Sequence, residues 1–417
     1  MESIGRHALR TVVIVGTFTL LGTAWMAVRH SGNAEATPAY ARRYGLECTS
    51  CHSPNPPRLN NVGMVFRRSG FRLPDADENG KLQLKTIAAH GIGDAMAVAA
   101  QIDGHHDQTV APGASRSGFE LSEVELIMGT AVGDRYSTQV LYIPYNDASE
   151  SELENAEFQV NLGKPESQFI ARAGLMQPLV WQKAGHGSMS LSSPLILDEG
   201  SPAPIGSFAG PGLGHMLSGV EAGYMFTNLK QGKLMTTMVS AAALNGFSLD
   251  GGAARQHPGD GTDLLVQATQ LFGSRNTVNA FHYDGRTILA YDVTGAISQR
   301  DKFTRTGLTG SFAPVDPIDL AAGYAMGEDK SDELGSKLKS RGYYGEVTGQ
   351  IMPYWVAMYR HDEFDPNTDA GGDLLRADVV STTYLLNQTL FLTAEYDQRQ
   401  VGAEKQHTYL ARVRFVY

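Results

Sequence analysis

The chain of 417 residues has no excess of basic residues, few charged residues and almost no long apolar runs. Its 34 lysines and arginines face 44 acidic residues, and the net charge of −10 argues against a nucleic-acid binder, which usually carries a basic patch. Only residues 11–28 approach the ~20 apolar residues of a membrane-spanning helix, which excludes a bundle of membrane helices. Because 42% of the residues are hydrophobic and 19% charged, the chain is not intrinsically disordered either.

The single apolar stretch belongs to a predicted export signal. Arg6 and Arg10 precede it, residues 11–28 form its apolar part, and the small-x-small tripeptide at residues 34–36 supplies a cleavage site. We therefore expect residues 1–36 to be a cleaved signal peptide and the mature protein to work outside the cytoplasm of a bacterium. An uncleaved membrane anchor is the alternative, because the apolar stretch is close to spanning length.

The only two cysteines of the chain lie in its most specific motif. Cys48, Cys51 and His52 fit the pattern C-x-x-C-H, through which c-type haem is attached. The two thiols add across the two vinyl groups of the porphyrin, and the histidine gives a ring nitrogen to the iron as proximal ligand. A redox dithiol would need a thioredoxin-like βαβ context, which the sequence lacks. A small structural disulfide is the other alternative. The histidine, the export signal and the lack of further cysteines favour one haem c per chain.

A short haem segment, residues 37–91, surrounds this motif. After it, apolar residues recur with helical spacing on one face, which suits the edge of a porphyrin. These residues are Leu59, Val62, Val65 and Phe66. The segment is too small for a core of its own, so it must pack against the rest of the protein.

The distal ligand of the haem iron has two candidates in this segment. Met64 follows the motif closely, and a methionine ligand raises the haem potential. His90 is the second candidate. Met64 is equally well explained as a core residue and His90 as an ordinary turn residue, and a ligand from elsewhere in the protein is a third alternative.

Residues 92–417 predict an all-β fold, a transmembrane antiparallel β-barrel. They show short alternating segments separated by glycine, aspartate, asparagine and proline, without helical periodicity. In the last segment Val413 and Phe415 alternate with Arg412 and Arg414, so one face suits lipid and the other a polar lumen. A soluble β-sandwich would alternate too. The aromatic residue at the end of the last strand resembles the terminal signal of outer-membrane barrels.

The number of strands follows from the lengths of the connections. We count seventeen strand-like runs, whereas single-chain bacterial barrels have even numbers, with short periplasmic turns and longer outer loops. Short and long connections alternate throughout only if runs 275–284 and 287–297 form one strand. That gives about sixteen strands with both barrel ends in the periplasm and enough width for a lumen. The long connections 104–118, 146–153, 177–216, 245–261, 327–340 and 363–372 would then lie outside.

Two stretches carry a resemblance to a known family. One runs from Ala41 through the C-x-x-C-H motif to residue 52, and the other from Pro57 to Phe71. Together with the export signal and the barrel, they resemble the fused monohaem cytochrome–porin family, which includes the outer-membrane iron oxidases of iron(II)-oxidising bacteria. The resemblance implies a cytochrome that plugs the lumen. It also implies electron transfer from extracellular iron(II) through the haem to a periplasmic c-type cytochrome or another carrier.

Simple chemistry agrees with this hypothesis. Iron(III) precipitates near neutral pH, so oxidation outside the cell keeps the product outside, and one haem suffices for a one-electron step. The expected partners are iron(II), a periplasmic electron carrier and outer-membrane lipid, and no nucleic acid. The alternatives are a solute porin with a structural haem and an electron conduit for another donor or acceptor.

Acidic and histidine residues cluster in the connections placed outside. Carboxylate and imidazole groups suit iron(II), although solvated porin loops carry similar clusters. The clusters are Asp147, Glu150, Glu152 and Glu154; Glu328, Asp329, Asp332 and Glu333; His361, Asp362, Glu363 and Asp365; and Gly104, His105, His106 and Asp107. Arg412 and Arg414 are expected in the lumen, where they would pair with haem propionates or act as general polar residues.

Overall fold

The computed structural model describes residues 39–53, 58–85, 97–111, 114–146, 151–177, 190–197, 213, 216–230, 233–250, 253–291, 297–331, 336–386 and 389–416. All of them belong to one compact unit, Thr37–Tyr417. The predicted signal peptide and His90 lie outside the described residues. Among the residues described, no helix has the length and apolar character needed to cross a membrane.

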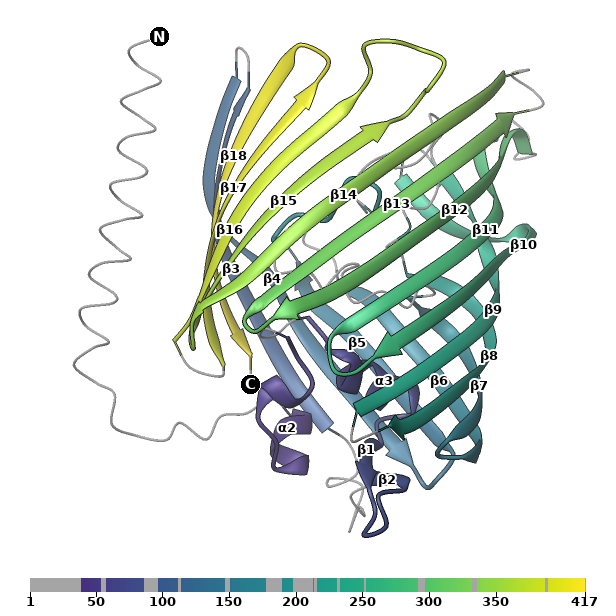
Figure 1. Cartoon of the computed structure of the whole chain (residues 1–417). Helices are drawn as coiled ribbons and strands as arrows, with labels where there is room; N and C mark the ends of the chain where they lie inside the picture. The colour runs from purple at the N-terminus through teal and green to yellow at the C-terminus, as the bar shows by residue number, and fades with distance from the viewer. Residues whose placement is uncertain are drawn as a thin grey trace. The chain divides into compact units, whose positions relative to one another are not determined.

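Sixteen antiparallel strands, β3 to β18, close into one barrel (Figure 1). Each strand pairs with the next along the chain, and β18 pairs with β3 to close the ring. The predicted antiparallel barrel of about sixteen strands is therefore confirmed. The strands are β3 (Ala97–Ala111), β4 (Ala114–Val132), β5 (Tyr136–Asn146), β6 (Glu152–Lys164), β7 (Ser167–Met176), β8 (Leu217–Lys230), β9 (Lys233–Asp250), β10 (Ala253–Phe272), β11 (Asn276–Tyr291), β12 (Ile297–Val315), β13 (Ile318–Ser331), β14 (Ser336–Met352), β15 (Trp355–Asp365), β16 (Leu375–Leu385), β17 (Leu390–Val401) and β18 (Glu404–Val416).

Two details of the strand prediction had opposite outcomes. The runs 275–284 and 287–297 do merge into the single strand β11. The long connections expected at 104–118 and 245–261 are wrong, because the strands on either side continue their pairing. Only residues 112 and 113 separate β3 from β4, and only residues 251 and 252 separate β9 from β10. In the β3–β4 hairpin, pairing thus extends well beyond the apolar part of β3. The polar C-terminal half of this strand resembles a loop in sequence but is paired along its length.

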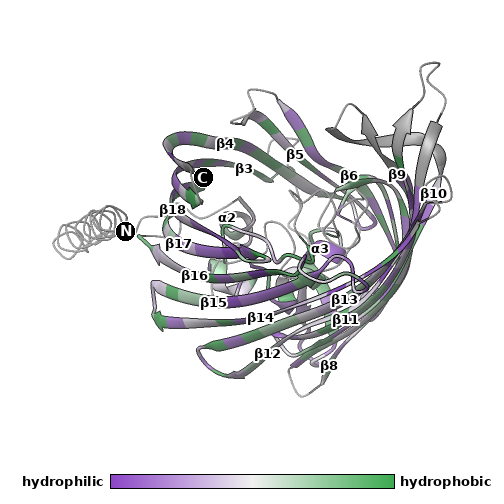
Figure 2. Ribbon diagram, turned by 90° about the horizontal axis from the view of Figure 1, so that it is seen from above, coloured by the Kyte–Doolittle hydropathy of each residue, from purple (hydrophilic) through white to green (hydrophobic). Residues whose placement is uncertain are grey.

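The barrel wall is apolar outside and polar inside. In β13, Tyr324 and Met326 are 43% and 50% exposed, whereas the alternating Asp319 is only 2% exposed. The same alternation of apolar and polar residues follows the strands in Figure 2. Arg414 of β18 points inward, where its Nε lies 2.8 Å from Oδ1 of Asp103. The predicted lipid face and lumen face of the last strand are therefore confirmed.

The two ends of the barrel differ in their connections. At one end, called the turn end here, neighbouring strands are joined by short turns such as 133–135, 273–275 and 316–317. At the opposite loop end, the connections include residues 177–216. In outer-membrane barrels, the short turns face the periplasm and the long loops face the outside.

This orientation predicts which engineered cysteines can be labelled in intact cells. Asp369, in the β15–β16 connection at the loop end, and Asp134, in the β4–β5 turn, are both exposed aspartates. A membrane-impermeant maleimide is expected to label Asp369→Cys strongly and Asp134→Cys only after the outer membrane is opened. The chain without an added cysteine gives the background. Equal labelling of both sites in intact cells would contradict the orientation.

An N-terminal segment of small elements precedes the barrel. It comprises α2 (Ala39–Tyr44), the 3₁₀ turn η1 (Cys48–Ser50), α3 (Asn61–Arg68) and a hairpin of β1 (Leu73–Ala76) with β2 (Leu82–Lys85). In the view along the barrel, α3 lies within the ring of strands (Figure 2). The segment thus packs against the barrel, as its small size requires.

Candidate cofactor site

The C-x-x-C-H motif forms one closed turn. The amide of Cys51 donates to the carbonyl of Cys48 at 3.2 Å, and the amide of His52 donates to the same carbonyl at 3.0 Å. Residues three apart on a 3₁₀ turn lie on the same side of it, so Cys48 and Cys51 share one side. Both side chains are half-buried free thiols. This is the donor set that two thioether bonds to one porphyrin require.

The acidity of the two thiols is unlike that of a redox dithiol. Burial raises the pKa of Cys51 to about 11, with a further contribution from the neighbouring Cys48. Burial also raises the pKa of Cys48. Reactive C-x-x-C cysteines instead have a lowered pKa, because the thiolate is the attacking species.

Asn60 fastens the turn to helix α3. Its side-chain oxygen accepts a hydrogen bond from the amide of Gly63 at 3.0 Å and so caps the helix. Its side-chain nitrogen faces the carbonyls of Ser50 and His52 at 3.2 and 3.4 Å. One asparagine thus couples the orientation of the motif to the orientation of α3.

Gly63 permits α3 to lie directly on the motif. A Cβ atom at this position would collide with the carbonyl oxygen of Cys51 and approach the side chain of Leu59. Any larger residue would push the helix away from the turn. The close contact between the two elements therefore depends on a glycine at this position.

The apolar face predicted for this region is divided between two neighbours. Met64 and Val65 are buried in a wall cluster with Ile170, Met225, Leu234, Met238 and Leu271 of the barrel, against which Leu59 and Val62 also pack. Phe66 instead packs against the rings of Tyr40, Tyr44 and Phe71, with centroid distances of 5.2 to 5.8 Å. Met64, one candidate distal ligand, is thus surrounded by barrel residues.

Polar contacts fix the N-terminal segment at the turn end of the barrel. The amide nitrogen of the Asn61 side chain donates to the carbonyl of Gly273 at 2.9 Å, in the β10–β11 turn. Arg72 donates to the carbonyl of Gly133 at 2.8 Å, in the β4–β5 turn. The Ser53 hydroxyl lies 3.2 Å from the carboxylate of Asp319, near the β12–β13 turn. The segment therefore contacts turns that lie far apart around the ring.

Arg68 takes part in a buried charge network with the inner wall. Its Nη1 lies 2.9 Å from Oε1 of Glu221 in β8. Glu221 also pairs with Arg172 of β7, and Arg172 in turn lies 2.8 Å from Glu157 of β6. Removing one member of a buried ion pair typically costs about 3–5 kcal/mol, since the remaining charge stays buried without its partner. This network is therefore the strongest polar link between α3 and the barrel.

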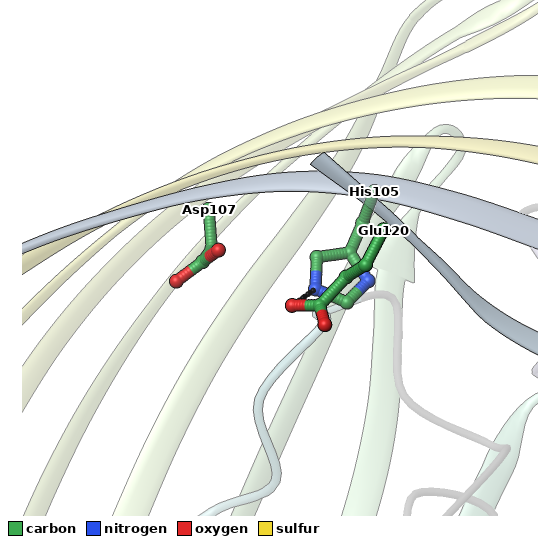
Figure 3. A group of neighbouring side chains, drawn as sticks. All are labelled: His105, Asp107 and Glu120. Atoms are coloured by element: carbon green, nitrogen blue, oxygen red, sulfur yellow. Dashed lines mark ion pairs between the residues drawn. The ribbon is translucent and has the colours of Figure 1, made fainter. Parts of the chain in front are cut away.

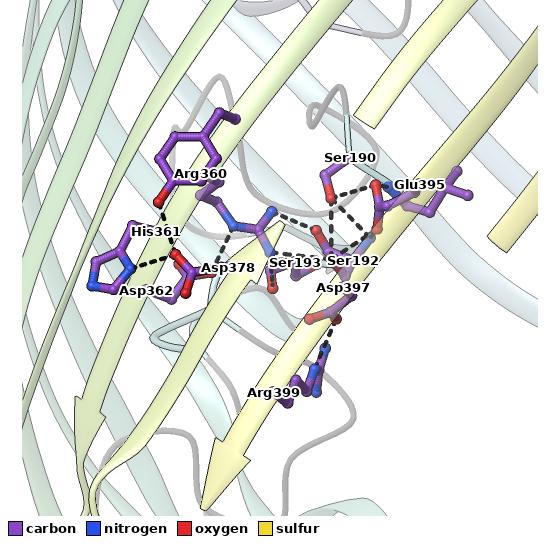
Figure 4. Close-up of polar contacts among 12 residues, drawn as sticks. Ser190, Ser192, Ser193, Arg360, His361, Asp362, Asp378, Glu395, Asp397 and Arg399 are labelled. Atoms are coloured by element: carbon purple, nitrogen blue, oxygen red, sulfur yellow. Dashed lines mark hydrogen bonds and ion pairs between the residues drawn. The ribbon is translucent and has the colours of Figure 1, made fainter. Parts of the chain in front are cut away.

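A loop from the opposite end also enters the barrel. Within the connection 177–216, residues 190–197 are held by hydrogen bonds to strands β15 and β17 (Figure 4). Glu395 of β17 accepts hydrogen bonds from the Ser190 hydroxyl at 2.8 Å and the Leu191 amide at 2.7 Å. Arg360 of β15 donates to the carbonyl of Ser192 at 2.7 Å. The expectation that this connection lies wholly outside is therefore wrong for these residues, since their hydrogen bonds are made to the inner wall.

The same loop contributes to a large apolar cluster on the inner wall. Ile196 and Leu197 are fully buried against aromatic side chains of the wall, and the polar contacts of Ser190 and Ser192 hold them there. The wall aromatics are Phe281, Tyr283, Phe303, Tyr344 and Phe364. Apolar side chains of this loop therefore pack against the inner face of the wall at this level.

The acidic clusters predicted as outer loops belong largely to strands. Asp329 is fully buried in β13 and lies 2.6 Å from Arg305, and Asp362 is fully buried in β15 and lies 2.7 Å from Arg360. Their placement as solvated loop residues is wrong, because the strands continue through them and alternation turns them inward. Glu328 does remain half-exposed and pairs with Lys337 at 2.7 Å.

The other residues of these clusters lie in different environments. His361 faces outward and lies 2.9 Å from the carboxylate of Asp378. Glu152 is exposed at the start of β6. Asp147, Glu150, Asp332 and Glu333 lie outside the described residues.

Sequence reasoning assigned no role to three residues that organise the site. Asn60, Gly63 and Arg68 hold the motif, the helix and the wall together. An asparagine just before a helical stretch is a cap signal that sequence alone offers. No local signal indicates that Arg68 pairs with Glu221, because the two residues are 153 positions apart.

Comparison with known proteins identifies the fold. No family model matches this chain, and no curated protein does either. Among solved structures, the anion-selective porin from Comamonas acidovorans is similar, with a TM-score of 0.54, 10% identity and coverage of 78% of this chain and 99% of the porin. The outer membrane channel DcaP of Acinetobacter baumannii has a TM-score of 0.52 and 11% identity, with 79% and 100% covered.

A third similar structure is OmpF of Salmonella typhi in complex with daunomycin. Its TM-score is 0.52 at 11% identity, with 77% of this chain and 97% of OmpF covered. At such identities the likeness concerns the fold alone. The chain therefore has the sixteen-stranded barrel fold of outer-membrane porins.

Proposed function

We propose that this protein is an electron-transfer cytochrome of the bacterial outer membrane that oxidises extracellular iron(II) and passes the electrons to a periplasmic carrier. The observation that carries the proposal is the position of the C-x-x-C-H turn. Ser53, directly after the motif, is hydrogen-bonded to Asp319 of the wall near a short turn. A haem bound there would lie at the periplasmic end of the barrel, within reach of a periplasmic carrier, and iron(II) would approach it from the loop end.

The residues of the turn fit a c-type haem. Cys48 and Cys51 would hold it through thioether bonds, and His52 would be the proximal iron ligand. Met64 or His90 would be the distal ligand. When bound, the haem supplies a centre that accepts one electron and gives it up again.

The remaining contacts explain why the turn needs a barrel. Asn60 and Gly63 fix the turn on α3, while Asn61 and Arg68 fix α3 on the wall. These contacts hold the motif in one orientation, and apolar wall residues cover the helix beside it. Exclusion of water from the surroundings of a haem is one means by which a protein sets its potential.

The acidic character of the chain suits a cationic donor. Carboxylates lining a narrow opening concentrate cations by long-range attraction. A solute porin with a structural haem is the second candidate, and it is supported by the porin fold. The loop and the segment that both enter the barrel favour electron transfer over solute passage.

The proposal is tested by stopped-flow absorption of the oxidised protein in detergent. Iron(II) is expected to reduce the haem at a rate proportional to its concentration. Raising the salt concentration to about 0.15 M is expected to slow the reaction by about two- to tenfold, because exposed charges are screened.

An anionic reductant provides the matched control. Reduction by ascorbate is expected to speed up with salt, since the acidic protein repels it at low ionic strength. A haem that dithionite reduces but iron(II) does not reduce under any condition would overturn the assignment to iron oxidation. The fold and the haem prediction would stand.

A further inference from the structure

Three side chains with metal-binding atoms meet on the lumen face of β3 and β4. One ligand atom from each of His105, Asp107 and Glu120 can be chosen so that all lie within 4.8 Å of one another (Figure 3). Alternation along β3 places His105 and Asp107 on the same face, and the register of the hairpin sets Glu120 directly opposite His105. His106 lies on the other face and stacks on Phe119, which is exposed.

The group faces the lumen. His105 is the cross-strand partner of Arg412 in β18, and Arg412 is one of the two inward-pointing arginines of that strand. Directly opposite residues of a β-sheet share a face, so His105 also points inward. A cation moving through the barrel would therefore pass these three side chains.

The ring of His105 is oriented by its neighbours. Its Nδ1 lies 2.5 Å from the hydroxyl oxygen of Ser122, and its Nε2 lies 3.1 Å from Oε1 of Glu120. With the hydrogen on Nδ1 donated to Ser122, the lone pair of Nε2 points to the side of the carboxylates. Histidine ligands of metals are typically held in this way by a hydrogen bond at the second ring nitrogen.

The carboxylate of Asp107 supplies an independent sign of a ligand. Its Oδ1 is shielded from solvent and has no hydrogen-bond partner among the described residues. Within the described part of the chain, no lysine or arginine forms an ion pair with Asp107, because Arg412 and Arg414 are both directed to Asp103.

We propose that His105, Asp107 and Glu120 bind a divalent transition-metal cation inside the barrel. One imidazole nitrogen and two carboxylate oxygens suit manganese(II) and iron(II), with water in the remaining positions. Only three protein ligands hold the ion, which allows it to leave again. The assignment of the cation as iron(II) rests on the proposed function, whereas the binding itself does not.

The test uses manganese(II) as the probe and the purified full-length protein. Free manganese(II) gives a six-line electron paramagnetic resonance signal that weakens on binding, so titration yields affinity and stoichiometry. We expect one site per chain. Asp107→Asn and Glu120→Gln are each expected to weaken the affinity by more than about tenfold, and Ser122→Ala by about tenfold, because loss of an outer-shell partner has that effect.

His106→Asn is the matched control, because it changes the neighbouring histidine on the opposite face. It is expected to leave the affinity unchanged. Folding of each variant is checked by the difference in electrophoretic migration between heated and unheated barrel. Equal manganese binding by wild type and Asp107→Asn would overturn the site.

The test also separates this site from the proposed function. If manganese(II) binding depends on the three ligands but iron(II) fails to reduce the haem, the metal site stands and the iron-oxidase function is overturned. Haem reduction by iron(II) in a protein that binds no manganese(II) keeps the function and overturns the site.

Discussion

Haem that stains after denaturing electrophoresis is expected on the wild-type chain and is expected to be absent when Cys48 and Cys51 are both replaced by alanine. Thioether bonds survive denaturation, whereas a haem held only by its iron ligands is released. Cys48 and Cys51 are the only cysteines of the chain, so no other thiol can form a thioether bond to the haem. The measurement is peroxidase staining of the gel, compared with protein staining of the same lane.

Ser50→Ala is the matched control for this result. Ser50 lies in the same turn but supplies no sulfur, so the stain is expected to persist. A stain that persists in the double cysteine variant would contradict covalent attachment. So would a wild-type haem that acidic organic solvent extracts completely.

Arg68→Glu is expected to raise the conductance of the barrel, because it loosens the segment at the turn end while the loop at residues 190–197 stays on the wall. The substitution places a negative charge beside Glu221 and Glu157, where the wild type has a buried ion pair. A loss of about 3–5 kcal/mol would lower the ratio of docked to undocked segment by about a hundredfold or more. The measurement compares the single-channel conductance of the wild type and of Arg68→Glu in a planar lipid bilayer.

Arg67→Glu separates this effect from a general change of charge. Arg67 neighbours Arg68 on α3, but its side chain is 30% exposed and lies 3.9 Å from Glu157. Glu157 is buried but keeps its closer ion pair with Arg172 at 2.8 Å, so the conductance is expected to change less than in Arg68→Glu. A wild-type protein that already conducts like an open porin would contradict the occluded lumen and favour the solute-porin alternative.

The strands of the barrel wall can be predicted from the sequence, whereas the segments that pack inside the barrel cannot. Alternation reveals lipid and lumen faces in β18 and the merging of two runs into β11, because both depend on neighbouring residues. The inward course of residues 190–197 depends on Glu395 and Arg360, which are 168 or more positions away. Periodicity carries no information about contacts at such separations.

The candidate site divides in the same way. The C-x-x-C-H motif is a local pattern with a chemical reason for its spacing, so it can be read directly from the sequence. The anchoring of α3 by Glu221 and the burial of Asp329 result from closure of the ring. A carboxylate in a strand and a carboxylate in a loop look alike until the partner across the barrel is known.

The contacts of the N-terminal segment also constrain the order of assembly. This segment leaves the export machinery first, yet Ser53 and Arg58 find their partners Asp319 and Glu346 only 266 and 288 residues later. Contacts of such long range form late, because the intervening chain must first be ordered. Thioether attachment needs only residues 48–52, so it can precede strand pairing. Under the proposed function, the C-x-x-C-H turn would then carry its haem before the barrel closes around it, and the segment would enter the membrane already loaded.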